Sequence, residues 1–234
     1  MRKNHTLPRL YWPDDLSSGT DIDLPDAQAH YLGNVLRKRS GDGVRLFNAN
    51  AGEWRAEITA VSKRKIALTV GERLRSPEPV TNITLLFAPI KKHRMTFILE
   101  KATELGATRL QPVITARTQL PRFNTEKARA QVIEAAEQCE RLDVPEVRDA
   151  APLLDVLAEW EHVPILFADE AGAENTVAPL SGPVALLVGP EGGFTDRERD
   201  VLRAMACVTP VTLGPRILRA DTAALFMLAR IQAS

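Results

Sequence analysis

The chain has 234 residues, 44% of them hydrophobic, and its 30 basic residues balance 30 acidic residues. This composition suits one large or two small globular domains, and the neutral balance gives no global sign of a polyanionic partner. No apolar run approaches the roughly 18 residues of a membrane-spanning helix, and no apolar signal segment follows the polar start MRKNHTLPR, so we expect a soluble, cytoplasmic protein.

The first 75 residues predict a compact module rich in β-strands. The segment that starts at Ala27, AQAHYLGNVLRKRSGDG, predicts one short helix and a turn. Apolar and polar residues then alternate in three short segments, which indicates a small antiparallel sheet or barrel. These segments are 44–48, 53–61 and 65–70. The segment 74–82 contains two prolines and has no periodicity, so we interpret it as a linker.

Beyond the linker, strands alternate with helices, which predicts an α/β domain. A strand at 83–89 precedes a helix that stops at Gly106, and a second helix begins near Asn124 or Thr125 with an apolar face running on to Cys139 and Leu142. Three continuous apolar runs are typical of central parallel strands that are covered on both faces: 163–169, 183–189 and 208–214.

Two loops carry the strongest signal for function. LVGPEGGFT at 187–195 and LGPRILRADTA at 213–223 each continue an apolar strand into Gly and Pro. Glycine permits positive φ and a close approach of a ligand to the main chain, so we interpret the two loops as a cofactor site for a nucleoside. The sequence has neither GxGxxG nor a Walker lysine here, which argues against a triphosphate. Either loop alone would be explained by glycines that simply form a turn.

Thr195 and Glu198 form a T-x-x-E capping box, which predicts that a helix starts after the first loop. The two cysteines, Cys139 and Cys207, lie in apolar patterns without metal-site spacing, so we expect buried free thiols. No cluster of His, Cys and Asp has ligand spacing, and we therefore predict no metal.

Three basic clusters interrupt the neutral balance of charge, at residues 37–39, 63–65 and 91–94. Each cluster adjoins an expected turn or the end of an element. Together they could follow a nucleic-acid backbone, and with equal weight they could be solvated surface.

Four motifs occur in order along the chain: ATELGATRLQPV at 102–113, AAEQCERLDVP at 135–145, GPEGGF at 189–194 and LGPRILRADTA at 213–223. With these motifs, and with PRLYW at 8–12 and HYLGNVLR at 30–37, the chain resembles the bacterial 16S ribosomal RNA uracil-N3 methyltransferases of the SPOUT superfamily. The resemblance covers essentially the whole chain.

The resemblance implies a PUA-like β-barrel for RNA at 1–75 and an α/β domain at 80–234. The second domain would contain a deep trefoil knot, bind S-adenosylmethionine without a metal and form a homodimer. The implied reaction is methylation of N3 of a specific uridine in 16S rRNA of the small ribosomal subunit. The implied cofactor residues are Leu166, Phe167, Gly189, Pro190, Glu191, Gly192, Leu213, Gly214, Ile217, Leu218 and Ala223.

Methylation at N3 requires loss of the imide proton and stabilisation of the negative charge that develops at O2 and O4. Arg219 is the first candidate for the electrostatic role because it is always charged, and a structural ion pair is an equal alternative. Asp221 is a candidate proton acceptor, but its place before Thr222 favours a helix N-cap. The family motif ends Leu-Arg-Thr-Glu-Thr-Ala, and Ala220 and Asp221 depart from it, so a catalytic role for Asp221 does not carry over from the family.

Glu137 and Arg141 lie four residues apart in an expected helix. An ion pair on the surface would explain them, and the family motif implies a substrate-side or dimer-side role, which makes Glu137 a further catalytic candidate. By position and charge, the candidate contacts to RNA phosphates are Arg9, Arg37, Lys38, Arg39, Arg117 and Arg141.

Two other functions compete with this prediction. Related enzymes of the same superfamily modify ribose 2′-hydroxyls or other bases. An RNA-binding assembly factor could instead keep the fold without catalysis, although such a protein has no physical need for two open nucleoside-binding loops.

Overall fold

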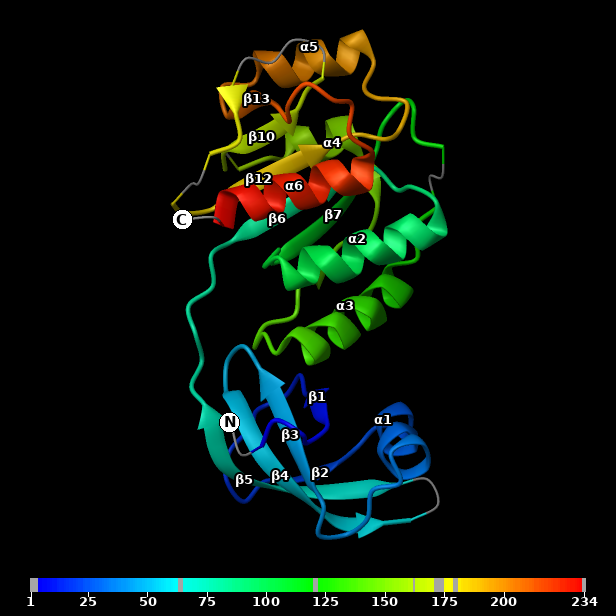
Figure 1. Ribbon diagram of the computed structural model, residues 1–234, viewed down its shortest axis with the longest axis vertical. Helices are drawn as coiled ribbons and strands as arrows, with labels where there is room; N and C mark the ends of the chain where they lie inside the picture. The colour runs from blue at the N-terminus through cyan, green and yellow to red at the C-terminus, as the bar shows by residue number, and fades with distance from the viewer. Residues whose placement is uncertain are drawn as a thin grey trace. The chain divides into compact units, whose positions relative to one another are not determined.

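The computed structural model describes residues 4–62, 65–119, 122–161, 163–170, 175–178 and 181–232. The chain forms two compact units, each with its own sheet (Figure 1). The first unit comprises Met1–Pro79 and Ala136–Val144, and the second comprises Val80–Ala135 and Pro145–Ser234. Residues 136–144, which sequence analysis assigns to the second domain, thus group with the first unit.

The first unit is built on a five-stranded sheet in the order β1-β3-β4-β5-β2. β3, β4 and β5 pair antiparallel, as predicted. Two strands that were not predicted extend the sheet: β2 pairs antiparallel with β5, and β1 pairs parallel with β3. Alternate apolar side chains such as Leu46, Ile58 and Leu68 are buried in one core. The strands are β1 (Arg9–Tyr11), β2 (Asp21–Asp23), β3 (Gly43–Asn48), β4 (Gly52–Val61) and β5 (Ile66–Arg75).

The helix expected after Ala27 is divided into two short pieces. The α-helix α1 (Asp26–His30) continues into a π-helical turn, η1 (Tyr31–Val35). Leu32 is buried in the core, whereas Tyr31 and Val35 are 39% and 59% exposed. The apolar residues of this segment therefore face two ways, into the core and into solvent.

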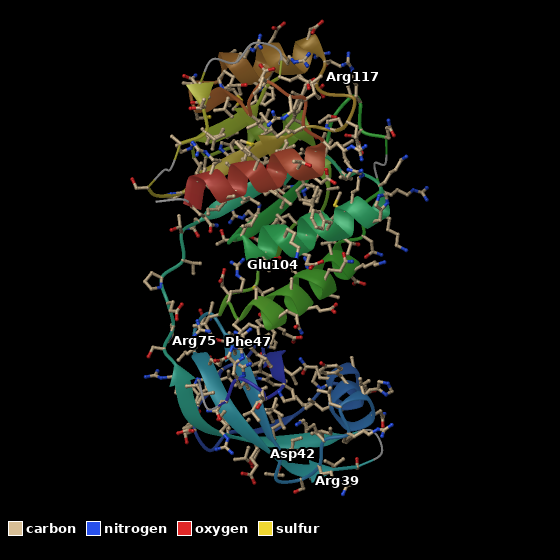
Figure 2. The ribbon with its side chains drawn as sticks, in the orientation of Figure 1. Arg39, Asp42, Phe47, Arg75, Glu104 and Arg117 are labelled. Carbon is tan, nitrogen blue, oxygen red and sulfur yellow. The ribbon has the colours of Figure 1, made fainter. Side chains whose placement is uncertain are left out.

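The segment 136–144 contributes to the core of the first unit. Ala136 and Leu142 pack against Phe47. Arg75, which Figure 2 shows near Phe47, donates a hydrogen bond of 2.7 Å from Nη1 to the carbonyl oxygen of Glu140. A part of the chain far from the N-terminus therefore completes this unit.

The second unit contains a sheet whose paired strands are parallel, in the order β11-β13-β10-β12-β6-β7-β8, with β9 paired to β7. The predicted strands at 83–89, 163–169, 183–189 and 208–214 are confirmed. The strands are β6 (Ile83–Phe87), β7 (Arg109–Ile114), β8 (Glu146–Val147), β9 (Ala151–Pro152), β10 (Ile165–Ala168), β11 (Asn175–Thr176), β12 (Val184–Val188) and β13 (Val208–Thr212).

In the described residues, the helices that accompany this sheet are α2 (Lys92–Glu104), α3 (Thr125–Cys139), α4 (Leu153–Ala158), α5 (Asp196–Ala204) and α6 (Ala220–Gln232). Helices α2 and α6 pack against each other, and they lie side by side in Figure 1. As predicted, α2 buries Met95, Ile98, Leu99 and Ala102 and is followed by Gly106, whose φ is +75°.

Helix α3 begins at Thr125, as predicted, but it ends at Cys139, before the predicted Leu142. Glu140 follows with a positive φ of +61°, which turns the chain out of the helix. The expectation of a buried Cys139 is wrong, because the thiol is exposed at this helix end, and Cys207 is only partly buried.

Candidate functional site

A cavity of about 190 Å³ lies at the carboxyl ends of three neighbouring parallel strands, β10, β12 and β13. Its lining comes from the loops that follow these strands and from the start of α6. Ligands of open α/β sheets bind at this edge, because the loops there present free main-chain groups. The two loops singled out in the sequence meet here.

Most of the residues predicted to bind the cofactor lie at this cavity. Leu166, Phe167 and Gly192 are not among its lining residues. Leu166 and Phe167 are buried within β10, where the Phe167 ring packs edge-on against Phe194 with centroids 5.0 Å apart. The predicted residues that do line the cavity are Gly189, Pro190, Glu191, Leu213, Gly214, Ile217, Leu218 and Ala223.

The glycines of the two loops have different structural reasons. Gly193 and Gly214 have positive φ, +66° and +103°. Gly189 does not, and a Cβ there would lie 2.5 Å from the Phe194 ring, so the small residue makes room for that ring. Of the glycines at 189, 192 and 193, only Gly193 adopts the positive φ that glycine permits.

Charged residues at the cavity were missed by sequence analysis. Asp169 is buried after β10, and it accepts a hydrogen bond of 3.0 Å from Arg203 Nε and lies 3.6 Å from Arg199 Nε. Glu170 has a side chain that is 55% exposed, and it lines the cavity with Arg199. The available signal was the position of Asp169 and Glu170 directly after a buried strand.

Glu198 and Arg117 hold the glycine-rich loop in place. The predicted capping box is confirmed. The Thr195 side chain accepts a hydrogen bond from the Glu198 backbone N–H, and the Glu198 side chain accepts one of 2.8 Å from the Thr195 backbone N–H. A second bond of 2.8 Å comes from the Ala116 N–H. Burial raises the pKa of Glu198, but the hydrogen bonds from Thr195 and Ala116 outweigh it, and the net pKa is below the ordinary glutamate value.

Arg117 lies on the loop beside α5 (Figure 2). Its Nη1 donates to the carbonyl oxygens of Gly192, at 2.9 Å, and Phe194, at 3.4 Å. Arg117 therefore supports the cofactor-site loop through Nη1, and because the residue is exposed, its contact to an RNA phosphate stays a prediction.

Asp221 and Arg219 lie where α6 begins. The expectation that Asp221 is the N-cap is wrong, because α6 starts at Ala220 and Asp221 belongs to its first turn. The buried Asp221 carboxylate accepts a hydrogen bond of 2.7 Å from Arg94 Nη1 on α2. Arg219 is exposed immediately before the helix, between the lining residues Leu218 and Ala220.

The prediction that Arg9 contacts RNA is wrong, because its side chain is only 3% exposed and lies inside the first unit. Its guanidinium carbon lies 3.4 Å above the Phe47 ring, and Nε donates to Glu53 at 2.6 Å. The other two nitrogens donate to the carbonyl oxygens of Ala136 and Arg141. Arg9 therefore fastens the segment 136–144 to the β-sheet.

Glu137 and Arg141 are also part of this internal structure. Glu137 Oε1 accepts a hydrogen bond of 3.0 Å from the Tyr11 backbone N–H. Arg141 lies beyond the end of α3, and its Nε donates to Asp143 at 3.0 Å with the side chain 11% exposed. The prediction that both residues lie on one helix is wrong, and neither side chain lies on an open surface.

The basic cluster at 37–39 lies on the surface of the first unit. Arg37 and Arg39 are exposed, and Lys38 is partly buried. The Arg39 backbone N–H donates a hydrogen bond of 2.8 Å to Asp42 Oδ2, and Figure 2 shows the two residues close together. Of the second basic cluster, residues 63 and 64 lie outside the described residues.

Within the ranges that the structure describes, no group of three or more His, Cys, Asp or Glu side chains could hold a metal ion. Over the same ranges, no helix is both long and apolar enough to cross a membrane.

The fold and the cavity are those of an RNA methyltransferase: residues 76–232 match the family model "RNA methyltransferase domain", and residues 24–71 match "RNA methyltransferase PUA domain". The chain belongs to this family, with a PUA-like first unit and a SPOUT-type α/β second unit, as the resemblance predicted.

Among its relatives, the chain is similar to ribosomal RNA small subunit methyltransferase E of Rickettsia conorii, with 34% identity over 96% of this chain and 94% of the relative. The protein of the same name from Synechocystis sp. is 38% identical over 94% and 75% of the two chains. The structure of the Neisseria gonorrhoeae enzyme of that name, bound to S-adenosyl methionine, superposes with a TM-score of 0.84 and 34% identity, covering 97% of each chain. A Legionella pneumophila protein in complex with the cofactor SAM superposes with a TM-score of 0.86 and 31% identity, also over 97% of each chain.

Proposed function

We propose that the chain transfers a methyl group from S-adenosylmethionine to N3 of a uridine in 16S rRNA of the small ribosomal subunit. The observation that carries the proposal is the cavity at the ends of β10, β12 and β13 in a chain of the RNA methyltransferase family. The names of its relatives and the cofactor bound in two similar structures support this substrate and this cofactor.

The cavity residues fit S-adenosylmethionine. Apolar side chains, among them Val188, Val211 and Leu213, suit the flat adenine ring. The positive φ of Gly193 and Gly214 turns the backbone so that main-chain groups can bond to a nucleoside. Glu170 and Arg199 carry charges opposite to the ammonium and carboxylate groups of the cofactor.

S-adenosylmethionine supplies an electrophilic methyl group when it is bound. The protein must then stabilise the negative charge that spreads to O2 and O4 of uracil once the imide proton leaves. Arg219 is exposed between two residues that line the cavity, and its charge persists at every working pH. We therefore give Arg219 the electrostatic role and Asp221, paired with Arg94, a positioning role at the start of α6.

The first unit binds the RNA in this proposal. Arg37 and Arg39 are exposed on its surface with Lys38 between them, and such a cluster can neutralise neighbouring phosphates. Arg9 and Arg141 are left out of the RNA-binding set because their side chains are 3% and 11% exposed and bond to internal groups. Arg117, which is exposed, stays in the set.

We include a cytoplasmic homodimer in the proposal, formed by the second unit. Phe97 of α2 and Phe226 of α6 are 43% and 39% exposed on two helices that pack together. Exposed aromatic side chains of this kind favour a protein interface. Light scattering on the wild type and on a Phe226→Ser variant tests this point, and a monomeric wild type would contradict it.

A trefoil knot in the second unit is also proposed, from the family resemblance. It rests on the resemblance alone, since a strand that lies between two later strands, as β10 does between β12 and β13, also occurs in unknotted doubly wound sheets.

The test of the reaction is methylation of small-subunit rRNA by the purified protein, followed by digestion to nucleosides and fragmentation in a mass spectrometer. We expect the added methyl group on the uracil base, at N3. A methyl group on the ribose would favour the alternative 2′-hydroxyl reaction. Cofactor binding without methylation of any RNA would favour an assembly factor.

Arg219→Ala tests the electrostatic role, with Arg197→Ala on α5 as a matched control because Arg197 is an exposed cation outside the cavity lining. Removal of a group that stabilises developing charge costs about 10²–10³-fold in kcat. We expect a loss of this order for Arg219→Ala alone, with cofactor affinity unchanged.

A further inference from the structure

A second cavity, of about 300 Å³, lies in the second unit between α2, α3 and the loop after β6. We call it the Phe123 cavity. Its apolar lining includes Ile90, Met95 and Leu99, which are buried, and Phe123. Its volume is at the lower end of the roughly 300–1,000 Å³ range of small-molecule sites.

The polar lining of the Phe123 cavity is strongly basic. Lys92 at the start of α2, Arg122 just before α3 and Lys127 at the start of α3 lie on its lining, and no carboxylate is among its lining residues in the described parts of the chain. Over the same parts of the chain, none of these three cations takes part in an ion pair. Such uncompensated positive charge around an apolar floor favours an anion with an apolar body.

Phe123 provides a fixed aromatic surface in this cavity. Its ring packs edge-on against the buried Phe87 ring, with centroids 6.0 Å apart and an interplanar angle of 69°. Thr96 and Gln131, both on the lining, are joined by a hydrogen bond of 3.0 Å that spans α2 and α3. An aromatic ring beside polar groups and cations is the composition that binds an unpaired nucleotide, because the base stacks on the ring.

An ion pair joins the two helices that contribute to the two cavities. Lys92 and Met95 of α2 line the Phe123 cavity, and Arg94 lies between them in the sequence. Arg94 donates a hydrogen bond of 2.7 Å to Asp221 of α6, a helix that lines the cofactor cavity with Ala220 and Ala223. The linings of the two cavities share no residue, so the Phe123 cavity is a separate site.

We propose that the Phe123 cavity binds one unpaired nucleotide of the RNA substrate, other than the nucleotide that is methylated. Its base stacks on Phe123, and its phosphate pairs with Arg122, Lys127 and Lys92. Because the Phe123 cavity shares no lining residue with the cofactor cavity, this nucleotide does not lie at the methyl group. This inference rests on the proposed function, because it takes RNA as the substrate.

The test measures the affinity of the full-length protein for small-subunit rRNA over a series of salt concentrations, together with methylation kinetics. For Arg122→Ala/Lys127→Ala we expect weaker RNA binding and a salt slope that is smaller by about 0.7 for each lost phosphate contact. Arg197→Ala removes an exposed cation from α5, and we expect it to leave the RNA affinity and the salt slope unchanged.

Phe123→Leu and Phe123→Tyr separate stacking from packing. Leu keeps an apolar side chain but not the flat ring, so we expect the RNA KM to rise about tenfold or more, since stacking contributes roughly 1–3 kcal/mol per base. Tyr keeps the ring and should restore a KM near that of the wild type. Calorimetry with S-adenosylmethionine should be unchanged in all of these variants. The thermal midpoint should fall in Phe123→Leu, which loses the edge-on contact with Phe87, and should be unchanged in the other variants.

The inference would be overturned if Arg122→Ala/Lys127→Ala and Phe123→Leu both kept the RNA affinity, the salt slope and the KM of the wild type. Equal losses in Phe123→Leu and Phe123→Tyr would also overturn the stacking role. A wild-type protein that binds S-adenosylmethionine but methylates no rRNA would instead contradict the proposed function, so the two failures are distinguishable.

Discussion

The carboxylate of Asp221 is buried in the first turn of α6 and bonds to Arg94 Nη1 at 2.7 Å. Both carboxylate oxygens are already engaged, because Oδ2 accepts the bond from Arg94 and Oδ1 accepts one of 2.9 Å from the Thr222 backbone N–H. At the residue scale, the contact therefore favours a positioning role for a side chain that the sequence alone offered as a candidate base.

A double-mutant cycle tests this role. Asp221→Asn and Arg94→Gln are each expected to lower kcat/KM by about tenfold, or ~1.4 kcal/mol of transition-state stabilisation. The double variant should lose little more than either single variant, because each change removes the same ion pair. A far larger loss in Asp221→Asn than in Arg94→Gln, with a changed pH–rate profile, would identify Asp221 as the proton acceptor.

Glu198 leads to a prediction about pH. Its pKa is lowered in the folded protein, since the hydrogen bonds from Thr195 and Ala116 outweigh the opposing effect of burial. Its contribution to stability is therefore present above the ordinary glutamate pKa, about 4.3, and is lost as the pH falls through the lowered value.

Thermal midpoints of the wild type and Glu198→Gln measure this effect. We expect their difference to be largest near neutral pH and to shrink as the pH falls below about 4.3. Glu134→Gln changes an exposed glutamate of α3 and serves as the control. A difference that stays constant down to the lowest measured pH would contradict the prediction.

At the scale of elements, the loops after β12 and β13 are shaped by backbone conformation. Gly214 has φ +103°, and a Cβ there would meet no atom within 4 Å, so only the backbone conformation demands glycine. Gly182 has φ +95° and the same open surroundings, but it lies outside the lining of the cofactor cavity. The two positions form a matched pair.

Gly214→Ala and Gly182→Ala should each cost roughly 1–3 kcal/mol of stability, because a side chain at these φ values strains the backbone. Only Gly214→Ala is expected to weaken binding of S-adenosylmethionine, by about tenfold, or ~1.4 kcal/mol. Calorimetric titration of both variants checks the prediction. Equal affinities would show that the shape of this loop does not determine cofactor binding.

On the scale of the whole molecule, the first unit depends on a segment that is distant in sequence. Leu142 is buried against Phe47, and the Arg9 guanidinium bonds to the carbonyl oxygens of Ala136 and Arg141. This segment reaches the first unit through α3, whose earlier part belongs to the second unit. The stability of the first unit therefore depends on contacts between residues that are more than 90 positions apart in the sequence.

Leu142→Ala should destabilise the first unit by about 2–5 kcal/mol, the usual cost of such a truncation in a core. Hydrogen exchange with mass spectrometry should show faster exchange in β1 and β3, with β10 and β12 unchanged. Leu154→Ala on α4 is the control, since Leu154 is 38% exposed. Unchanged exchange in β1 and β3 would mean that the segment 136–144 adds little stability.

By itself, the sequence determined the elements whose signals are local. Apolar alternation predicted β3 to β5, continuous apolar runs predicted β10, β12 and β13, and the Thr195 and Glu198 pair predicted the start of α5. Periodicity and capping act within a few residues, so they can be recognised in a linear sequence. Its motifs also identified the family, which the family models confirm.

Only the tertiary structure decided which side chains are free to act. Arg9 and Glu53 are 44 residues apart, and Arg94 and Asp221 are 127 residues apart, so no local sequence pattern indicates either ion pair. In the same way, Phe167 continues an apolar run towards the cofactor loop but is buried against Phe194. Burial and ion pairing depend on groups that folding brings together from distant positions, and a linear sequence does not specify those neighbours.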